Sequence, residues 1–119
     1  MNQIIEYYAN AMLQFVNVFS SKLDAARKDV GRKTAQGVCG IVIPLRGYAH
    51  FSFNQTVYKM NEHTIVHAGS SMDIEIETLN EECEYAVIHY RIVDAPYPFK
   101  EMEHQHFMMM IDEQTKIQQ

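Results

Sequence analysis

The strict alternation of apolar and acidic residues in "MDIEIE", residues 72–77, constrains the fold more than any other segment. Successive side chains of a β-strand point to opposite faces, so Met72, Ile74 and Ile76 share one side and the acidic residues share the other. Burying those carboxylates without partners would cost several kcal/mol each. The segment therefore predicts a strand whose apolar side faces a core and whose acidic side faces water.

Short apolar runs recur along the chain from Val38 onward, with turn-forming residues between them. Gly47 joins two of the runs, Asn54 and Gln55 predict a tight turn, and the acidic stretch 79–84 predicts another. Strands that recur every ~8 to 12 residues are typical of an antiparallel sandwich or small barrel, so we expect an all-β fold. The expected strands cover residues 38–45, 48–53, 56–60, 64–68, 72–78 and 85–93.

The N-terminal region fits two structures. Its apolar residues follow a helical stripe, which allows one uninterrupted helix to Lys28. However, "FVNVFSS", residues 15–21, is rich in residues that favour a strand over a helix interior. We expect a short helix over residues 3–12 and a strand over 13–23, with the uninterrupted helix as the alternative. Residues 24–37 are expected to form a polar connection that ends in glycine.

The chain of 119 residues is long enough for one domain, with its core expected over residues 13–93. Pro96 and Pro98 end the strand pattern. Residues 94–119 are expected to form a linker with a short strand, followed by the start of a C-terminal helix near Asp112. A helix of one or two turns cannot hold itself in water. We therefore expect the chain to be one domain of a longer polypeptide, with a stand-alone sensor as the alternative.

Charge and composition exclude several classes of protein. A net charge of -5 and a pI near 5.6 argue against direct nucleic-acid contact, because nucleic-acid-binding domains need a cationic face. No apolar stretch approaches ~18 residues and the N-terminus lacks the pattern of a signal peptide, so no membrane association is expected. Cys39 and Cys83 are expected to be free thiols in a reducing compartment, which indicates a cytoplasmic protein.

Five motifs follow one another through residues 40–92: "LRG", "YAHFSF", "VYKM", "TIVHAG" and "YAVIHY". In order and spacing they resemble the N-terminal cupin domain of AraC-type transcriptional regulators. The resemblance implies a double-stranded β-helix (cupin) barrel that binds a small-molecule effector of the sugar, siderophore or carboxylate class and forms a homodimer. It also implies a DNA-binding half with two helix-turn-helix units. Residues 94–119 lack the basic two-helix pattern that this half needs.

The metal ligands of many cupins have no counterpart in this sequence. Relative to Gly47, Gly40 stands where the family's glutamate stands, and "KTAQ", residues 33–36, stands in place of two histidines. Relative to Gly69, Met72 stands in place of the last histidine. A divalent metal needs three or four converging donors, so we expect no metal and no cofactor. Without a recognisable nucleophile, acid and base, we also expect no enzyme.

Alternation along two strands identifies five candidate ligand contacts. A small barrel buries one face of each strand, which places Met72 and Ile74 inside. In "YAVIHYRIV", Tyr85, Val87 and His89 share one face, and the alternate residues form a more apolar face suited to packing against another element. The resemblance implies that the first two of these three residues face the ligand. We therefore predict that this mixed face lines the pocket.

Arg46 is the sixth candidate ligand contact, because it lies directly before Gly47 in "PLRG". The resemblance implies that an arginine at this place reaches the effector. Its guanidinium offers a rigid fork of five donors, which suits a hydroxyl-rich or carboxylate ligand. Alternatively, Arg46 lies at a strand end in water or pairs with Glu62 or Asp73.

Three functions remain open from the sequence. The first is a ligand-sensing regulatory domain of an AraC-type transcription factor, which contacts DNA only through a separate domain. The second is a structural or dimerisation module whose barrel interior is simply a core. The third is a metal-dependent cupin enzyme, which the vacant ligand positions disfavour.

Overall fold

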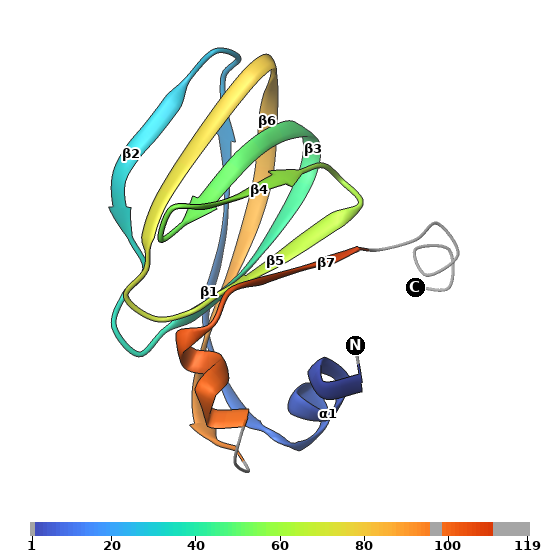
Figure 1. Cartoon of the computed structure of the whole chain (residues 1–119), viewed down its shortest axis with the longest axis vertical. Coiled ribbons are helices and arrows are strands. Elements are labelled where there is room, and N and C mark those ends of the chain that lie inside the picture. The colour runs from blue at the N-terminus through green and yellow to red at the C-terminus, as the bar shows by residue number, and fades with distance from the viewer. Residues whose placement is uncertain (1, 96–98, 111–119) are drawn as a thin grey trace.

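The computed structural model describes residues 2–95 and 99–110, and antiparallel strands make up most of them. Helix α1 (Asn2–Asn10) precedes the strands, and a 3-10 helix, η1 (Phe99–His104), precedes the last one. The strands are β1 (Met12–Leu23), β2 (Lys28–Lys33), β3 (Cys39–Phe53), β4 (Thr56–Met60), β5 (Thr64–Ala68), β6 (Asp73–Asp94) and β7 (Phe107–Met110) (Figure 1). The prediction of an all-β fold is confirmed. Neither of the helices described is long and apolar enough to cross a membrane.

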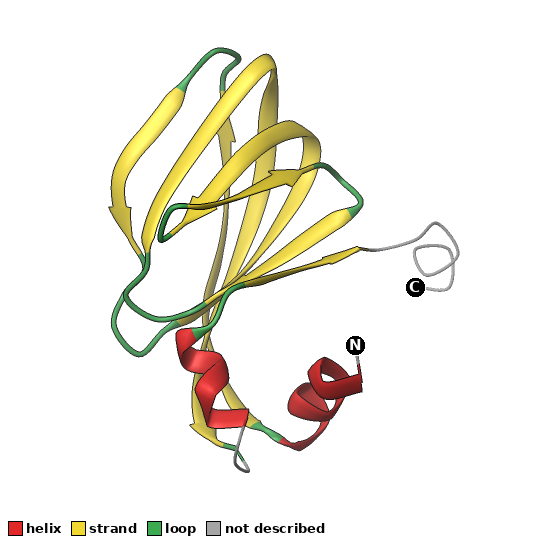
Figure 2. Ribbon diagram, viewed as in Figure 1, coloured by secondary structure: helices red, strands yellow, loops and turns green. Residues whose placement is uncertain are grey.

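Two long strands, β3 and β6, hold the sheet together. They pair antiparallel over almost their whole length, from Cys39 opposite Tyr90 to Phe53 opposite Ile74. Both strands bend along their length, so the sheet curls into two facing layers (Figure 2). β1, β5 and β7 extend the layer that contains the first half of β3. β2 and β4 extend the layer that contains its second half.

The bend depends on a close approach of two backbones at Gly47. The φ angle of Gly47 is +88°, in the left-handed region that favours glycine. A Cβ atom at this position would lie 2.1 Å from the carbonyl oxygen of Glu82 on β6. The pairing register shifts on both sides of the glycine, between Pro44 and Arg46 and between Gly47 and Ala49. No other residue fits between these two strands without moving the backbone.

Residues 79–84 continue β6 through its bend and do not form the predicted turn. Their composition favours a turn, but the pairing of Thr78 on one side, and of Cys83 and Glu84 on the other, with neighbouring strands keeps the chain extended. The acidic residues also gain cationic neighbours, since Lys22 of β1 lies 3.3 Å from Glu82 and Arg46 of β3 lies opposite Glu84. The two strands expected on either side of this stretch are therefore one strand of 22 residues.

The other boundary predictions are mostly confirmed. α1 and β1 match the expected helix and strand, and pairing of β1 with β6 excludes the uninterrupted helix to Lys28. The connection expected over residues 24–37 contains β2, which the sequence analysis missed because its residues are almost all polar or glycine. Residues 94–119 include the expected short strand as β7, and also η1. The helix expected from Asp112 lies outside the described residues.

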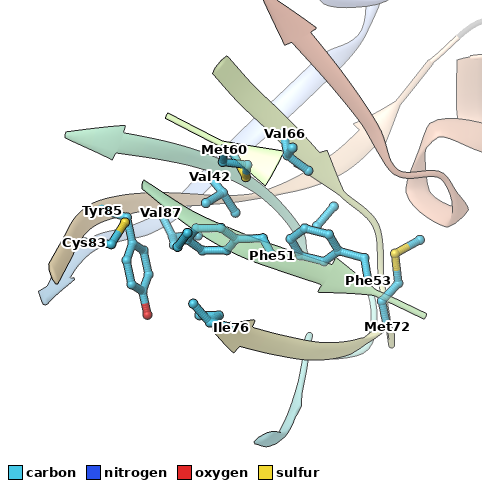
Figure 3. Close-up of a cluster of buried hydrophobic side chains, with 12 residues drawn as sticks. Val42, Phe51, Phe53, Met60, Val66, Met72, Ile76, Cys83, Tyr85 and Val87 are labelled. Carbon is cyan, nitrogen blue, oxygen red and sulfur yellow. The ribbon is translucent and has the colours of Figure 1, made fainter. Parts of the chain in front are cut away.

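The two layers bury the main core between them (Figure 3). Met72 and Ile76 are buried and Ile74 is half-buried, whereas Asp73 and Glu75 are exposed, as the alternation predicted. Figure 3 shows the rings of Phe51 and Phe53 side by side on β3. Together with Met72 and Ile76, the buried residues of this cluster are Val42, Ala49, Phe51, Phe53, Met60, Val66, Ala68, Cys83, Tyr85 and Val87.

A second cluster fastens α1 to the opposite face of β6. Tyr7 of α1 is buried against Cys39 and Tyr90, and its ring lies 6.2 Å from that of Phe99 in η1. The Tyr90 hydroxyl lies 2.9 Å from the Tyr7 hydroxyl and 2.5 Å from Nε2 of His67. Nδ1 of His67 donates to the carbonyl of residue 105 at 3.1 Å, so Nε2 accepts from Tyr90, which in turn accepts from Tyr7.

Substitution of Gly47 tests the close approach at the bend. We expect Gly47→Ala to lower the free energy of unfolding by about 3 kcal/mol or more, because its Cβ meets a backbone oxygen in addition to the backbone strain. Gly31→Ala is the matched control. Gly31 has a similar φ of +79° but no atom within 4 Å of a Cβ, so we expect a loss of about 1 to 2 kcal/mol. Urea denaturation measures both changes, and an equal loss of unfolding free energy in Gly47→Ala and Gly31→Ala would contradict the close contact at Gly47.

Acid should destabilise the fold through His67. Burial lowers the pKa of His67 to about 4, whereas the unfolded chain takes up the proton near its ordinary pKa of 6.5. The neutral His67 side chain therefore contributes fully to the free energy of unfolding above pH 6.5. This contribution, about 3 kcal/mol in total, is lost as the pH falls toward 4.

The check is the free energy of unfolding against pH for the wild type and His67→Phe. The variant should be less stable at pH 7 and should lose less stability between pH 6.5 and 4. His104→Gln, at an exposed histidine, should follow the wild-type curve. If the free energy of unfolding of His67→Phe fell with pH in parallel with that of the wild type, His67 would not be the cause of the acid sensitivity.

Candidate ligand-binding site

A narrow apolar hollow of about 60 Å³ lies between the two layers of the sheet. Large side chains fill much of the interior around it, and the rings of Phe51 and Tyr85 meet edge to face with centroids 5.3 Å apart. An engineered cavity of about 150 Å³ can hold benzene, so this hollow takes only a short apolar group. Its lining consists of Phe19, Arg32, Thr34, Gly40, Val42, Phe51, Phe53, Ala68, Ile74, Ile76, Tyr85, Val87 and His89.

The hollow opens into a wider groove of about 570 Å³, which we call the mouth groove. Five residues line both spaces and so form the passage between them: Phe19, Arg32, Thr34, Ile74 and His89. The mouth groove is further lined by Val16, Asn17, Lys33, Ala35, Val38 and Arg91. Its volume falls within the range of small-molecule sites. The narrow hollow and the groove together form a pocket with an apolar inner end and a polar outer end.

His89 is oriented at this passage by its neighbours. Its Nδ1 lies 2.8 Å from Oδ1 of Asn17 on β1, and the ring of Phe19 lies 5.5 Å from its own ring. Burial lowers the pKa of His89, which favours the neutral ring. The ring edge that carries Cδ2 and Nε2 faces Gly40, where a Cβ would lie 3.6 Å from Cδ2 and 3.9 Å from Nε2. Because Gly40 has no side chain, the space between His89 and Val87 stays open.

Four of the six predicted contact residues come together in the hollow: Ile74, Tyr85, Val87 and His89. Met72 is buried in the same core cluster but does not line the space. Its sulfur instead accepts from the backbone N–H of Gly69 at 3.3 Å. Tyr85, Val87 and His89 therefore face inward, as predicted for the mixed face of "YAVIHYRIV". Contact with a ligand stays a prediction for all six residues.

Arg46 does not lie in the hollow, and the predicted placement there is wrong. The irregular register between Pro44 and Arg46 reverses the alternation, so that Arg46 lies opposite Glu84 on the outer side of β6. It is exposed and lines a separate groove at the bend, together with Glu62 and other residues. Of the alternatives, the position at the solvent-facing bend is the one observed.

Arg32 supplies the guanidinium that the sequence analysis assigned to Arg46. It lies opposite Ile74 in the pairing of β2 with β6, and Asp29 lies opposite Ile76. Nε of Arg32 lies 2.7 Å from Oδ2 of Asp29. Arg32 is absent from the predicted contacts because the polar composition of its segment predicts a loop. The available signal was the Asp29–Arg32 pair around Gly31, which is the position of a strand irregularity.

The two thiols are poorly suited to nucleophilic chemistry. Cys39 and Cys83 are free thiols, as expected. Both are also buried, and burial raises the pKa of each to about 11. Roughly one thiol in ten thousand is then ionised at pH 7. Within residues 2–95 and 99–110, no group of three or more His, Cys, Asp or Glu side chains is arranged to hold a metal ion. The absence of a bound metal stays a prediction.

Comparison with solved structures identifies the fold. The chain superposes on a predicted oxalate decarboxylase from Thermotoga maritima with a TM-score of 0.57 and 16% identity, covering 66% of this chain and 69% of that one. It superposes on the cupin domain of Cnp3 from Schizosaccharomyces pombe with a TM-score of 0.54 and 12% identity, covering 67% and 64%. For ToxT of Vibrio cholerae bound to an unsaturated fatty acid, the TM-score is 0.61 at 11% identity, covering 88% of this chain and 43% of ToxT.

These structures share a cupin fold, and the chain has that fold. The predicted double-stranded β-helix barrel is thereby confirmed. No protein-family model and no curated protein matches the sequence. The likeness therefore concerns the fold alone.

The low reactivity of the thiols can be measured directly. We expect the folded protein to react slowly with an aromatic disulfide reagent at pH 7, because both thiols are buried and protonated. After unfolding in guanidinium chloride, both cysteines should react quickly. Rapid labelling of either residue in the folded protein would contradict this prediction and would identify an activated or accessible thiol.

Proposed function

We propose that this chain is a ligand-sensing cupin domain that holds a small molecule in the apolar hollow and the mouth groove. The observation that carries the proposal is the continuity of these two spaces at Phe19, Arg32 and His89. An apolar end with a few convergent polar groups at its opening is the usual form of a small-molecule site. Because the hollow is small, most of the ligand would lie in the mouth groove.

We further propose that the domain belongs to an AraC-type regulator and mediates homodimerisation. Support comes from the ordered motifs in residues 40–92 and from the shared fold with ToxT, which has been solved with an unsaturated fatty acid bound. In this proposal DNA contact belongs to a separate helix-turn-helix domain. The acidic net charge of the chain is consistent with DNA contact through a separate domain.

β6 offers a direct route from the ligand to α1. His89 faces the passage into the hollow, and the next residue, Tyr90, faces the opposite side and bonds Tyr7 of α1. A ligand that favours one position of His89 would therefore favour one packing of α1. Such a ligand shifts a population only to the extent that it binds one arrangement better than the other.

Binding is favoured over catalysis by the state of the chemically active side chains. The thiols are protonated at neutral pH, and both ring nitrogens of His67 are engaged, one with Tyr90 and one with a carbonyl. A side chain in that condition is a poor nucleophile or base. The small volume of the hollow favours the second candidate, a structural module without a ligand, and the next experiment separates the two.

A ligand screen with a blocked variant tests the proposal. We would measure melting temperature with sugars, catecholate siderophores, and aliphatic and aromatic carboxylates. A ligand at about 100 times its Kd stabilises the native state by ~2.7 kcal/mol, or roughly 10 °C for a domain of this size. Gly40→Val should abolish the rise, since its methyl groups enter the hollow beside Val87 and His89.

Gly40→Ala is the matched control for the blocked variant. Its single Cβ makes ordinary contacts of 3.5 Å, so the fold should keep its stability and much of its ligand response. No rise with any compound in the wild type would favour the structural module. An equal rise in the wild type and Gly40→Val would place binding outside the hollow.

A further inference from the structure

The charge of the mouth groove is opposite to that of the molecule. The chain carries a net charge of -5, yet the residues that line this groove include Arg32, Lys33 and Arg91 and no aspartate or glutamate. The negative net charge of the chain repels anions, so a group of cations at the opening of an apolar hollow is unexpected for a surface without a ligand. Asp29 offsets part of the charge of Arg32, and the cations that remain indicate that the outer end of the pocket suits an anion.

Two of these cations, Arg32 and Arg91, line the groove from different strands. Arg32 is placed by β2 on the inner side of its layer, opposite Ile74, and Asp29 engages its Nε. The two terminal nitrogens of the fork are the atoms that bind a carboxylate side by side. Arg91 extends from β6 toward the loop before β3, and a Cβ at Gly37 would lie 3.4 Å from its Nη1. The two guanidinium groups therefore flank the groove from different strands.

The inner end of the pocket is unsuited to a sugar. The hydroxyl of Thr34 already donates to the carbonyl of Gly69 and accepts from the backbone of Met72, at 2.7 and 2.6 Å. Apart from it, the polar groups of the hollow are Arg32 at the passage, the hydroxyl of Tyr85 and the neutral ring of His89, and the other lining residues are aliphatic, aromatic or glycine. A hydroxyl-rich ligand would lose more hydration there than these few groups could replace.

We propose that the ligand is an anion with an apolar body, of the aliphatic or aromatic carboxylate class, whose carboxylate meets Arg32 and Arg91 while its apolar end enters the hollow. This assignment rests on the proposed function and names the ligand class for the same pocket. Each methylene that enters an apolar site raises affinity by about fourfold. Affinity should rise along the series until the hollow is full and then level off.

Calorimetric titration of a homologous series provides the test. The probes are straight-chain carboxylates from butyrate to decanoate, together with hexanamide as the neutral counterpart of hexanoate. We expect hexanoate to bind at least about tenfold more tightly than hexanamide, with weaker binding at high salt. Arg32→Gln should remove the preference for the carboxylate by weakening hexanoate far more than hexanamide, and Arg91→Gln should reduce the preference.

Arg27→Gln is the matched control, because Arg27 is exposed in the connection between β1 and β2 and lines neither space. It should leave the carboxylate preference intact. If Arg32→Gln does not fold, Arg91→Gln and the comparison of hexanoate with hexanamide in the wild type still decide the question. Circular dichroism checks the fold of each variant.

The outcomes separate the two proposals. If a sugar binds the wild type but not Gly40→Val, and hexanoate binds no better than hexanamide, the pocket stands and the carboxylate class is wrong. If carboxylates bind equally to the wild type, Gly40→Val and Arg32→Gln, the binding is adventitious and the inference is wrong. If no compound of any class binds, the proposed function itself fails.

Discussion

The structure depends on the pairing of β3 with β6 through a shared bend. Each strand crosses from one layer to the other, and the crossing is possible because Gly47 lets the two backbones approach where a Cβ would meet the carbonyl of Glu82. β1, β2, β4 and β5 each pair with one half or the other of these two strands, and β7 pairs with β5. The two layers, the core between them and the hollow within that core all follow from the one bend.

The bend also decides which side chains reach the hollow. The irregular register beside Gly47 turns Arg46 outward, while the pairing of β2 brings Arg32 to the opening. A one-residue shift in a strand exchanges its two faces, so a local irregularity changes the lining of a pocket without changing the fold. The cationic mouth and the apolar hollow therefore come from strands distant in sequence.

The two faces of β6 have different roles. One face lines the core and the hollow, and the other carries Tyr90 into the hydrogen-bonded chain with Tyr7 and His67. That chain joins α1, β5, β6 and the segment before β7 through buried polar groups, which is why these elements form one unit at the end of the sheet (Figure 1). Adjacent residues on one strand thus connect a candidate ligand site with the N-terminal helix.

Local patterns in the sequence determined the all-β class, the apolar face of residues 72–76 and the inward face that carries Tyr85, because period-two alternation and burial cost act residue by residue. Tertiary structure alone decided that residues 79–84 stay in a strand and that Arg32 replaces Arg46 at the pocket. Those outcomes depend on the register of distant strands and on one backbone contact at Gly47, which local composition does not determine.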